Sequence, residues 1–265
     1  MNLRELLNKR LIIVSGKGGV GKTSVSTLLA LLAAERNKKV LIVEMNATGR
    51  IAPIFEARQV MQKEIQLTPL VSAINLSPEL CFKDYAINLL YFSTLYKSFF
   101  TNRYVSNFIN AVPGLDEFMM LAKINDLENQ TKGKLSSRMK YDLIVIDAPA
   151  TGHGLSLLEV PATIASAIKI GPPHKQALSI MEMLSDKNRT AFCLVTLAEE
   201  MPVCESEEYL NAIKERTNLG LGPMFVNAVM PEIETIEKME KLPKKLKLFK
   251  DYYVLAQKRF ELNQY

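Results

Sequence analysis

Two short apolar runs, LIIV (residues 11–14) and VLIV (residues 40–43), flank an alanine- and leucine-rich segment that extends from Thr23 to about Glu35. Runs this short and this continuously apolar are typical of parallel strands that are buried on both faces. The longer segment has the length and the composition of a helix. The pattern therefore predicts a βαβ unit over residues 11–43.

Three further apolar runs predict strands, and segments with helical spacing separate them. The predicted strands cover residues 141–149, 191–197 and 223–229, and the predicted helices cover residues 156–170, 175–184 and 204–217. Strands and helices that alternate in this order indicate an α/β fold with a doubly wound, mostly parallel sheet. We expect residues 1–265 to form a single domain of this class.

The second and third predicted strands are separated by far more residues than a crossover helix requires. The range 52–140 reads as mostly helical, with its aromatic and aliphatic side chains concentrated in residues 85–100 and 105–127. We interpret it as a helical insertion above the carboxyl edge of the sheet, where ligands bind in such folds. The apolar side chains of this range are accounted for if they pack against the sheet and against one another.

Composition and charge argue against a nucleic-acid-binding, a secreted and a membrane-spanning protein. The chain has 265 residues, 48% of them hydrophobic, and its net charge of +5 is spread along the sequence without a basic tail that would suggest nucleic acid. The segment MNLRELLNKR does not resemble a signal peptide, and no apolar run reaches the about 18 residues that cross a bilayer. Three cysteines without a CxxC pair fit a reducing compartment. We expect a cytoplasmic protein without nucleic-acid binding or stable membrane insertion.

The candidate chemistry is concentrated in a glycine-rich segment, residues 16–23, which fits G-x-x-x-x-G-K-[ST] between a predicted strand and a predicted helix. Glycines allow the backbone to turn its N–H groups toward phosphate oxygens, Lys22 supplies an ammonium group, and the Thr23 hydroxyl is suited to Mg²⁺. ATP and Mg²⁺ are thus the predicted cofactors. The predicted nucleotide contacts in this phosphate loop and just after it are Gly16, Lys17, Gly18, Gly19, Val20, Gly21, Lys22, Thr23 and Ser24.

An acidic residue at the end of a neighbouring apolar strand is the second element expected of a nucleotide site. Asp147, which follows LIVI, fits this description, and such a carboxylate usually holds the magnesium shell through a water. We therefore predict that Thr23 and Asp147 form the metal site. The APATGHG segment that begins at Ala148 predicts a flexible turn suited to sensing the γ-phosphate, in which His153 positions other groups by hydrogen bonding.

The segments GKGGVGKTS and DAPATGHGLSLLEVP together resemble the deviant-Walker-A ATPases, and most of all the ArsA/Get3 family of arsenite-pump ATPases and tail-anchored-protein targeting factors. Three further stretches agree, namely VPGLDEF, LVTLAEEMPVCESEEYL and FVNAVMP, so the similarity extends from about residue 10 to residue 231. The resemblance implies a P-loop NTPase of the SIMIBI type. It also implies a homodimeric switch that hydrolyses Mg-ATP and couples its nucleotide state to a protein partner or a hydrophobic client.

The resemblance also implies roles for individual residues. Lys17, like the early lysine of the family's loop, would reach across the dimer interface to the partner's phosphates and act in catalysis together with Lys22. Asn227 would recognise the adenine edge through hydrogen bonds of its amide, and Pro231 would line one side of the base-binding pocket. Asn46 stands where the family usually carries an aspartate that orients the attacking water. The resemblance thus implies that Asn46 is a catalytic residue together with Lys17 and Lys22.

The departures from the family pattern leave alternatives open. An asparagine at position 46 can bind a water but cannot take its proton, so the sequence fits either slow hydrolysis or a non-hydrolysing ATP-binding regulator. Glu44 is either an ordinary strand-end carboxylate or a substitute for the missing aspartate. A ParA/MinD-like positioning ATPase is a third interpretation. In targeting factors of the family the insertion lines a groove for hydrophobic helices, a role that Met119 and Met120 would suit. The three cysteines form no cluster in the sequence, so the sequence does not support a metalloid cargo.

Overall fold

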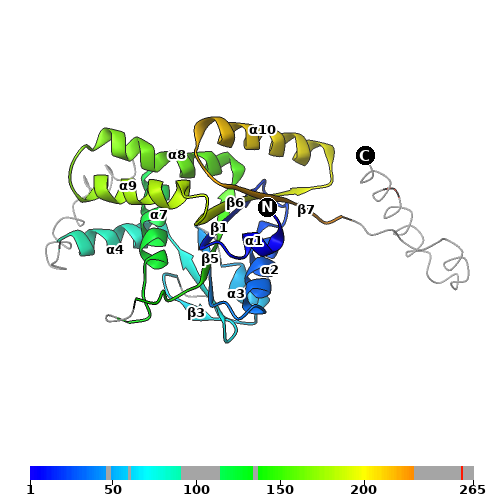
Figure 1. The fold of residues 1–265 in the computed structure, drawn as a ribbon, viewed down its shortest axis with the longest axis horizontal. Helices are drawn as coiled ribbons and strands as arrows, with labels where there is room; N and C mark the ends of the chain where they lie inside the picture. Colours follow the sequence, from blue (N-terminus) through cyan, green and yellow to red (C-terminus); the bar gives the residue numbers. More distant parts are fainter. Residues whose placement is uncertain (46–48, 59–60, 91–113, 134–136, 230–257, 259–265) are drawn as a thin grey trace, which may run out of the picture.

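The computed structural model describes residues 1–45, 49–58, 61–90, 114–133, 137–229 and 258. Among these residues, seven strands form one sheet in the order β3-β4-β2-β5-β1-β6-β7 (Figure 1). Neighbouring strands are parallel except for β3 and β4, which are antiparallel. The strands are β1 (Leu11–Gly16), β2 (Val40–Met45), β3 (Ile65–Gln66), β4 (Val71–Leu76), β5 (Leu143–Ala150), β6 (Thr190–Leu197) and β7 (Leu221–Asn227). The predicted fold class is confirmed.

Helices cover both faces of this sheet (Figure 1). One face packs against α1 (Leu3–Leu6), α2 (Lys22–Ala34) and α3 (Ile51–Ile54). The other packs against α4 (Pro78–Leu90), α7 (Leu115–Glu128), α8 (Thr151–Ala167), α9 (Pro172–Ser185) and α10 (Glu200–Arg216). Within the described ranges, no helix is both long enough and apolar enough to cross a membrane.

The continuous apolar runs of the strands follow from these two layers. In β1, Leu11 and Ile13 belong to the core on the α8 side, whereas Ile12 and Val14 belong to the core on the α2 side. Because both faces of a central parallel strand are covered, these four consecutive positions are all apolar and the usual alternation with polar residues is absent. The same order places the carboxyl ends of β1, β2 and β5 side by side, where the phosphate loop begins.

Two strands lie inside the range 52–140, although the sequence pattern there was interpreted as mostly helical. β4 pairs along its whole length with β2, from Val40 opposite Val71 to Met45 opposite Leu76, and β3 pairs with β4. The helices α4 and α7 also lie in this range, in agreement with the prediction. Residues 91–113 and 134–136 lie outside the described part, so the insertion as a separate subdomain and the single-domain organisation stay predictions.

Helix α7 is part of the main core. Phe118, Met119 and Met120 are at most 5% exposed and pack with the side chains of α8, α9 and β6. At the start of the helix, a Cβ added to Gly114 would lie 2.4 Å from Cγ2 of Val160 on α8, so the two helices are in close contact. The two methionines therefore cover the sheet and are unavailable as a surface for a partner, which excludes them from the groove considered above.

A buried ion-pair network ties the end of α7 to the starts of two strands. Glu128 is 2% exposed, and its Oε1 accepts hydrogen bonds from Nε of Arg10 at 3.2 Å and from Nε of Arg189 at 3.0 Å. Nη2 of Arg10 donates to the Glu128 carbonyl at 2.8 Å, and Nη2 of Arg189 donates to the second carboxylate oxygen. One carboxylate thus joins α7 to the residues that precede β1 and β6.

Candidate functional site

The phosphate loop connects β1 to α2, and two of its glycines are required by the geometry. Gly21 is the N-cap of α2 with φ of 92°, and a Cβ there would lie 2.1 Å from Nδ2 of Asn227. A Cβ on Gly16, at the end of β1, would lie 2.3 Å from the Val195 carbonyl oxygen of β6. Because neither position has room for a side chain, the loop can lie close to β6 and β7 only with glycine at both positions.

Lys22, the first residue of α2, extends back over the loop. Its Nζ donates a hydrogen bond to the Lys17 carbonyl oxygen at 2.9 Å. Burial lowers the pKa of Lys22, and the nearby Asp147 carboxylate opposes this effect. Nothing lies within 4 Å of a Cβ placed on Gly18 or Gly19, so the loop is open beside this ammonium group. A phosphate oxygen could therefore take the place of the Lys17 carbonyl as acceptor.

The structure brings together the two residues predicted to hold Mg²⁺. The Thr23 hydroxyl donates to Oδ2 of Asp147 at 2.7 Å, and the Ser26 hydroxyl lies 3.4 Å from Oδ1. Asp147 is 8% exposed, and burial raises its pKa, while the hydrogen bond from Thr23 and the charge of Lys22 oppose the rise. A hydroxyl and a carboxylate beside an open loop suit a hard cation that keeps waters and phosphate oxygens in its shell. These residues therefore fit Mg²⁺.

The burial of Asp147 has a consequence for stability. Its pKa in the folded state lies above that of the unfolded chain, so the stability contributed by the protonated form is present below about pH 4 and is lost as the pH rises through the folded pKa. We expect Asp147→Asn to raise the melting temperature of the nucleotide-free protein at pH 7 by roughly 2–4 °C, because the buried charge is removed. Thermal unfolding at several pH values checks this: the gain should shrink toward pH 4, and a lower melting temperature at pH 7 would contradict it.

Glu44 lies beside Asp147 at the end of β2. The two residues are register partners on neighbouring strands. Side chains two positions apart point to the same face of a strand, and Ile42 and Val145, two positions before them, belong to the core on the α2 side. Glu44 and Asp147 therefore also face the α2 side. Glu44 is fully buried, and its Oε1 accepts hydrogen bonds from the backbone N–H of Arg50 at 2.6 Å and of Ile51 at 3.2 Å. Burial raises its pKa, and these two N–H groups oppose the rise. The sequence indicates Glu44 only as a charged residue at the end of an apolar strand, and it gives no sign of these two hydrogen bonds.

The second oxygen of Glu44 is also informative. Among the described residues, Oε2 has no hydrogen-bond partner although it is buried. A buried carboxylate oxygen without a partner is costly, and such groups concentrate where a ligand, an ion or a water completes the site. The carboxyl edge of β2 and β5 is therefore polar beneath the phosphate loop.

Lys17 forms an ion pair within its own chain. Its Nζ contacts Oε1 of Glu205 on α10, and the two side chains are 49% and 35% exposed. Exposed pairs of this kind contribute little to stability, at most about 1 kcal/mol, so the contact can be exchanged for another at low cost. The sequence did not predict that α10 touches the loop.

Asn227 ends β7 and also contacts the phosphate loop. Its Nδ2 donates to the Val20 carbonyl oxygen at 2.8 Å, so the predicted adenine reader lies against the loop. Asn46 and Pro231 lie outside the described residues. The expectation of a flexible turn at APATGHG is wrong, because β5 extends to Ala150 and α8 begins directly at Thr151.

The three cysteines are free thiols, and two of them are buried. Burial raises the pKa of Cys81 to about 11 and that of Cys193 to about 12, so both thiols stay protonated at neutral pH, whereas Cys204 is exposed. In the part of the chain that the structure describes, no three His, Cys, Asp or Glu side chains come together as a metal site. A bound Mg²⁺ would therefore rely on Thr23, Asp147 and the phosphates themselves.

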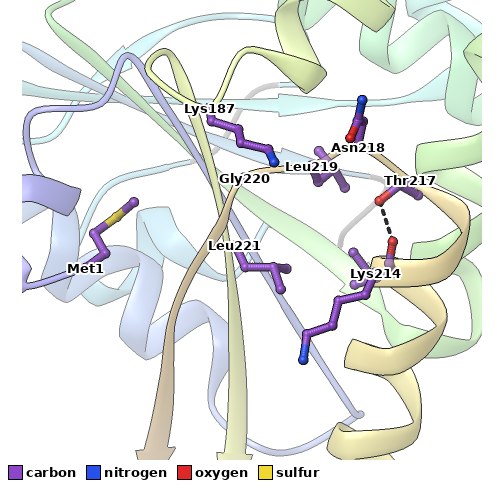
Figure 2. A pocket seen from close by; sticks show the side chains of 9 residues that line it. Met1, Lys187, Lys214, Thr217, Asn218, Leu219, Gly220 and Leu221 are labelled. Carbon is purple, nitrogen blue, oxygen red and sulfur yellow. Dashed lines mark hydrogen bonds between the residues drawn. The ribbon is translucent and has the colours of Figure 1, made fainter.

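A hollow of about 440 Å³ lies at the opposite edge of the sheet, where β6 and β7 begin (Figure 2). Lys187, Lys214 and Leu221 line it, and the Thr217 hydroxyl beside them donates to the Ile213 carbonyl oxygen at 2.8 Å. Ligands of open α/β sheets bind at the carboxyl ends of the strands, and none of the nucleotide-binding motifs reaches this hollow. The phosphate loop is thus the better candidate for the functional site.

Comparisons with known proteins point to one family of ATPases. A family model described as anion-transporting ATPase matches residues 9–183 and 169–262. ATPase BagA of Mycobacterium tuberculosis is 32% identical over 231 residues, which cover 84% of this chain and 66% of that protein. The arsenical pump-driving ATPase of Escherichia coli is 26% identical, with 84% of this chain and 40% of that protein covered, and an ASNA1 homologue of Plasmodium berghei is 25% identical, with 89% and 68% covered. The chain thus spans just under two thirds of the mycobacterial relative and less than half of the arsenical pump-driving ATPase.

The matched ranges contain every described residue of the site, from the phosphate loop through Asp147 to Asn227. The family model covers well over half of the chain, and the relatives named ATPase cover most of it as well. The chain therefore belongs to the ArsA/Get3 family of anion-transporting ATPases.

Proposed function

We propose that the chain binds Mg-ATP at the phosphate loop and hydrolyses it slowly as the switch of a homodimer. The observation that carries this proposal is the contact between the Thr23 hydroxyl and Asp147 beside the Lys22 ammonium group. These three groups supply a metal ligand, an acceptor for the metal's waters and a cation for the phosphates at one edge of the sheet. The names of the relatives, which include ATPases and arsenical pump-driving ATPases, support the same activity.

The dimer is part of the proposal because of Lys17. In the structure this lysine pairs with Glu205 of its own chain, on the exposed side of the loop. In the proposed dimer it leaves Glu205 and contacts the partner's nucleotide, where it stabilises the charge that develops on the transferred phosphoryl group. Each site is then complete only when two copies meet, most simply around a two-fold axis.

The proposal is tested with the wild-type chain. Its molar mass is measured in solution without nucleotide, with Mg-ADP and with a non-hydrolysable Mg-ATP analogue, and hydrolysis is followed in a single turnover at excess protein. We expect a dimer with the ATP analogue and a slow release of phosphate. A chain that binds no nucleotide would overturn the proposal.

Lys17→Ala provides a specific prediction. We expect nucleotide affinity to change less than about threefold, while the hydrolysis rate falls by about 100- to 1000-fold, because one transition-state cation is lost. Glu205→Ala is the matched control: it removes the same ion pair but keeps the cation, and should leave the rate intact. Equal rate losses in both variants would contradict the role of Lys17.

Mixing variants tests whether Lys17 acts in trans. Lys17→Ala and Lys22→Ala subunits are each inactive alone, but their mixed dimer contains one site with an intact Lys22 and the partner's Lys17. Random pairing makes half of the dimers mixed, each with one complete site, so about a quarter of the wild-type rate should return. No recovery, despite mixed dimers in solution, would show that Lys17 acts within its own chain.

A second candidate function is a regulator that binds ATP without hydrolysing it. The observation in its favour is Asn46 at the position where the family resemblance implies an aspartate. The single-turnover measurement separates the two, because a regulator would form the dimer with ATP and release no phosphate above the Lys22→Ala background.

The partner of the switch is proposed to be a protein or a hydrophobic client that contacts the range 52–140. Two aliphatic side chains in the described part of this range, Ile54 and Met61, are exposed. Their exposure is compatible with such a contact. The support for a client otherwise comes from the family resemblance.

A further inference from the structure

Arg50 lies at the carboxyl edge of the sheet, on the path of the chain from β2 to α3. It is the N-cap residue of α3, with φ of −94° and ψ of −24°. Its backbone N–H donates to the buried Oε1 of Glu44 at 2.6 Å, and that of Ile51 donates to the same oxygen. Glu44 in turn is the register neighbour of Asp147. The backbone of Arg50 is therefore fixed to the strand that flanks the proposed metal site.

The Arg50 side chain is exposed, and its backbone is hydrogen-bonded to Glu44, the register neighbour of Asp147, at the edge of the nucleotide site. Burial is the main influence on the pKa of Lys22, Glu44 and Asp147, and the charge of Arg50 contributes a further lowering at all three. These directions agree with a guanidinium placed on the same side of the sheet as the phosphate-loop lysine and the two buried carboxylates.

The surroundings of this guanidinium leave it available to a ligand. Among the described residues, no hydrogen bond or ion pair engages its side-chain nitrogens, and the nearby Glu44 oxygen already accepts two backbone N–H groups. A second cation beside Lys22 is unfavourable unless anions balance it. The two carboxylates supply part of that balance, and the triphosphate of a bound nucleotide would supply the rest.

We propose that Arg50 contacts the terminal phosphate of bound ATP from within the same chain, and that Glu44 is the positioning residue that holds it there. The inference rests on the proposed function and adds to it a third cation besides Lys22 and Lys17. A guanidinium is planar and presents paired donors, which suits two oxygens of one phosphoryl group.

The chemical step explains why such a cation matters. Hydrolysis forms a bond between the water oxygen and the γ-phosphorus and breaks the bond from that phosphorus to the bridging oxygen. The bridging oxygen leaves on ADP with the electron pair, and the proton of the water ends on the released phosphate or in solvent. Negative charge is spread over the transferred group during this exchange, and a guanidinium in contact with that group stabilises it.

The ratio of ATP to ADP affinity is the decisive measurement, because only ATP has the terminal phosphate. Displacement of a fluorescent nucleotide, with Mg²⁺ present, is measured for the wild type, Arg50→Ala, Arg50→Lys and the control Arg36→Ala. Arg36 is an exposed arginine just after the opposite end of α2, so its removal changes the net charge equally. Thermal unfolding confirms that all four proteins are folded.

We expect Arg50→Ala to weaken Mg-ATP binding by about 10-fold or more and Mg-ADP binding by less than about twofold. Arg50→Lys should recover part of the difference, and Arg36→Ala should match the wild type. Where hydrolysis is measurable, kcat should fall in Arg50→Ala more than KM rises, which a merely structural role would not produce.

Two results would overturn the inference, and they are distinguishable. If Arg50→Ala weakens ATP and ADP equally, or neither, Arg50 does not contact the terminal phosphate and the proposed function stands. If the wild type itself binds neither nucleotide, the proposed function fails and the inference fails with it.

Discussion

Lys22→Ala is expected to weaken Mg-ATP binding by on the order of 100-fold and to reduce hydrolysis to background. The Lys22 ammonium group is half-buried over the phosphate loop, where burial lowers its pKa and the Asp147 carboxylate opposes this effect. Without it, the triphosphate would lose its central cation and Asp147 would lose a nearby positive charge. Isothermal titration with Mg-ATP, together with a phosphate-release assay, measures both effects.

Lys38→Ala is the matched control for this substitution. Lys38 follows the other end of α2, burial also lowers its pKa, and its Nζ donates to the Leu7 carbonyl oxygen at 2.6 Å. Its chemistry is thus close to that of Lys22, but no phosphate is expected near it. Lys38→Ala should reduce stability and leave nucleotide affinity unchanged. Similar nucleotide affinities in the two variants would show that Lys22 only supports the fold.

Glu128→Ala is expected to produce the largest loss of stability, about 3 kcal/mol in the free energy of unfolding. The substitution leaves Arg10 and Arg189 without their shared carboxylate and separates α7 from the starts of β1 and β6. For a chain of this size, such a loss lowers the melting temperature by roughly 10 °C. Urea unfolding with and without nucleotide measures the effect, and Glu128→Gln should cost less because it retains one acceptor.

The control for Glu128 is a carboxylate paired on the surface. Glu159 lies 3.8 Å from Nη1 of Arg216, and both side chains are exposed. Exposed pairs contribute about 0–1 kcal/mol, so Glu159→Ala should change the free energy of unfolding by less than about 1 kcal/mol. Equal costs at the two glutamates would show that burial of the network does not determine its contribution.

The fold class and the core of the candidate site were predictable because they depend on local sequence. Buried parallel strands are continuously apolar, and the phosphate loop is a contiguous motif between a strand and a helix. Asp147 was found because it ends an apolar run next to such a motif. The structure then places it against Thr23, 124 residues earlier in the chain.

The features that were missed depend on contacts between distant segments. β4 contains Ser72 and Asn75 in a short run, and it is recognisable as a strand only through its pairing with β2. The small residues after Asp147 indicated a turn, but in the structure the strand continues directly into α8. Neither the hydrophobic pattern nor a sequence motif shows that Glu205 on α10 contacts the phosphate loop. Charged residues on a helix face are common, and the sequence does not indicate which segment they contact.

Glu44 and Arg50 illustrate the same limit at the site. In the sequence they are a carboxylate that ends a strand and an arginine six residues later, a spacing that implies no interaction. Their relation is set by the main chain, which returns to β2 so that the Arg50 N–H meets the Glu44 carboxylate. Charge patterns alone could not reveal it, since the partner of Glu44 is a backbone group that every residue except proline possesses.

The closeness of Gly21 and Asn227 couples two positions that are far apart in the sequence. A methyl group at position 21 would lie 2.1 Å from the Asn227 amide, so a side chain there would require the asparagine, 206 positions later, to move away from the Val20 carbonyl oxygen. Alanine at position 21 would therefore disturb the hydrogen bond between Asn227 and the phosphate loop, besides straining the backbone at φ of 92°. The fit of the phosphate loop against β7 thus couples the residue proposed to recognise the base to the loop proposed to hold the phosphates.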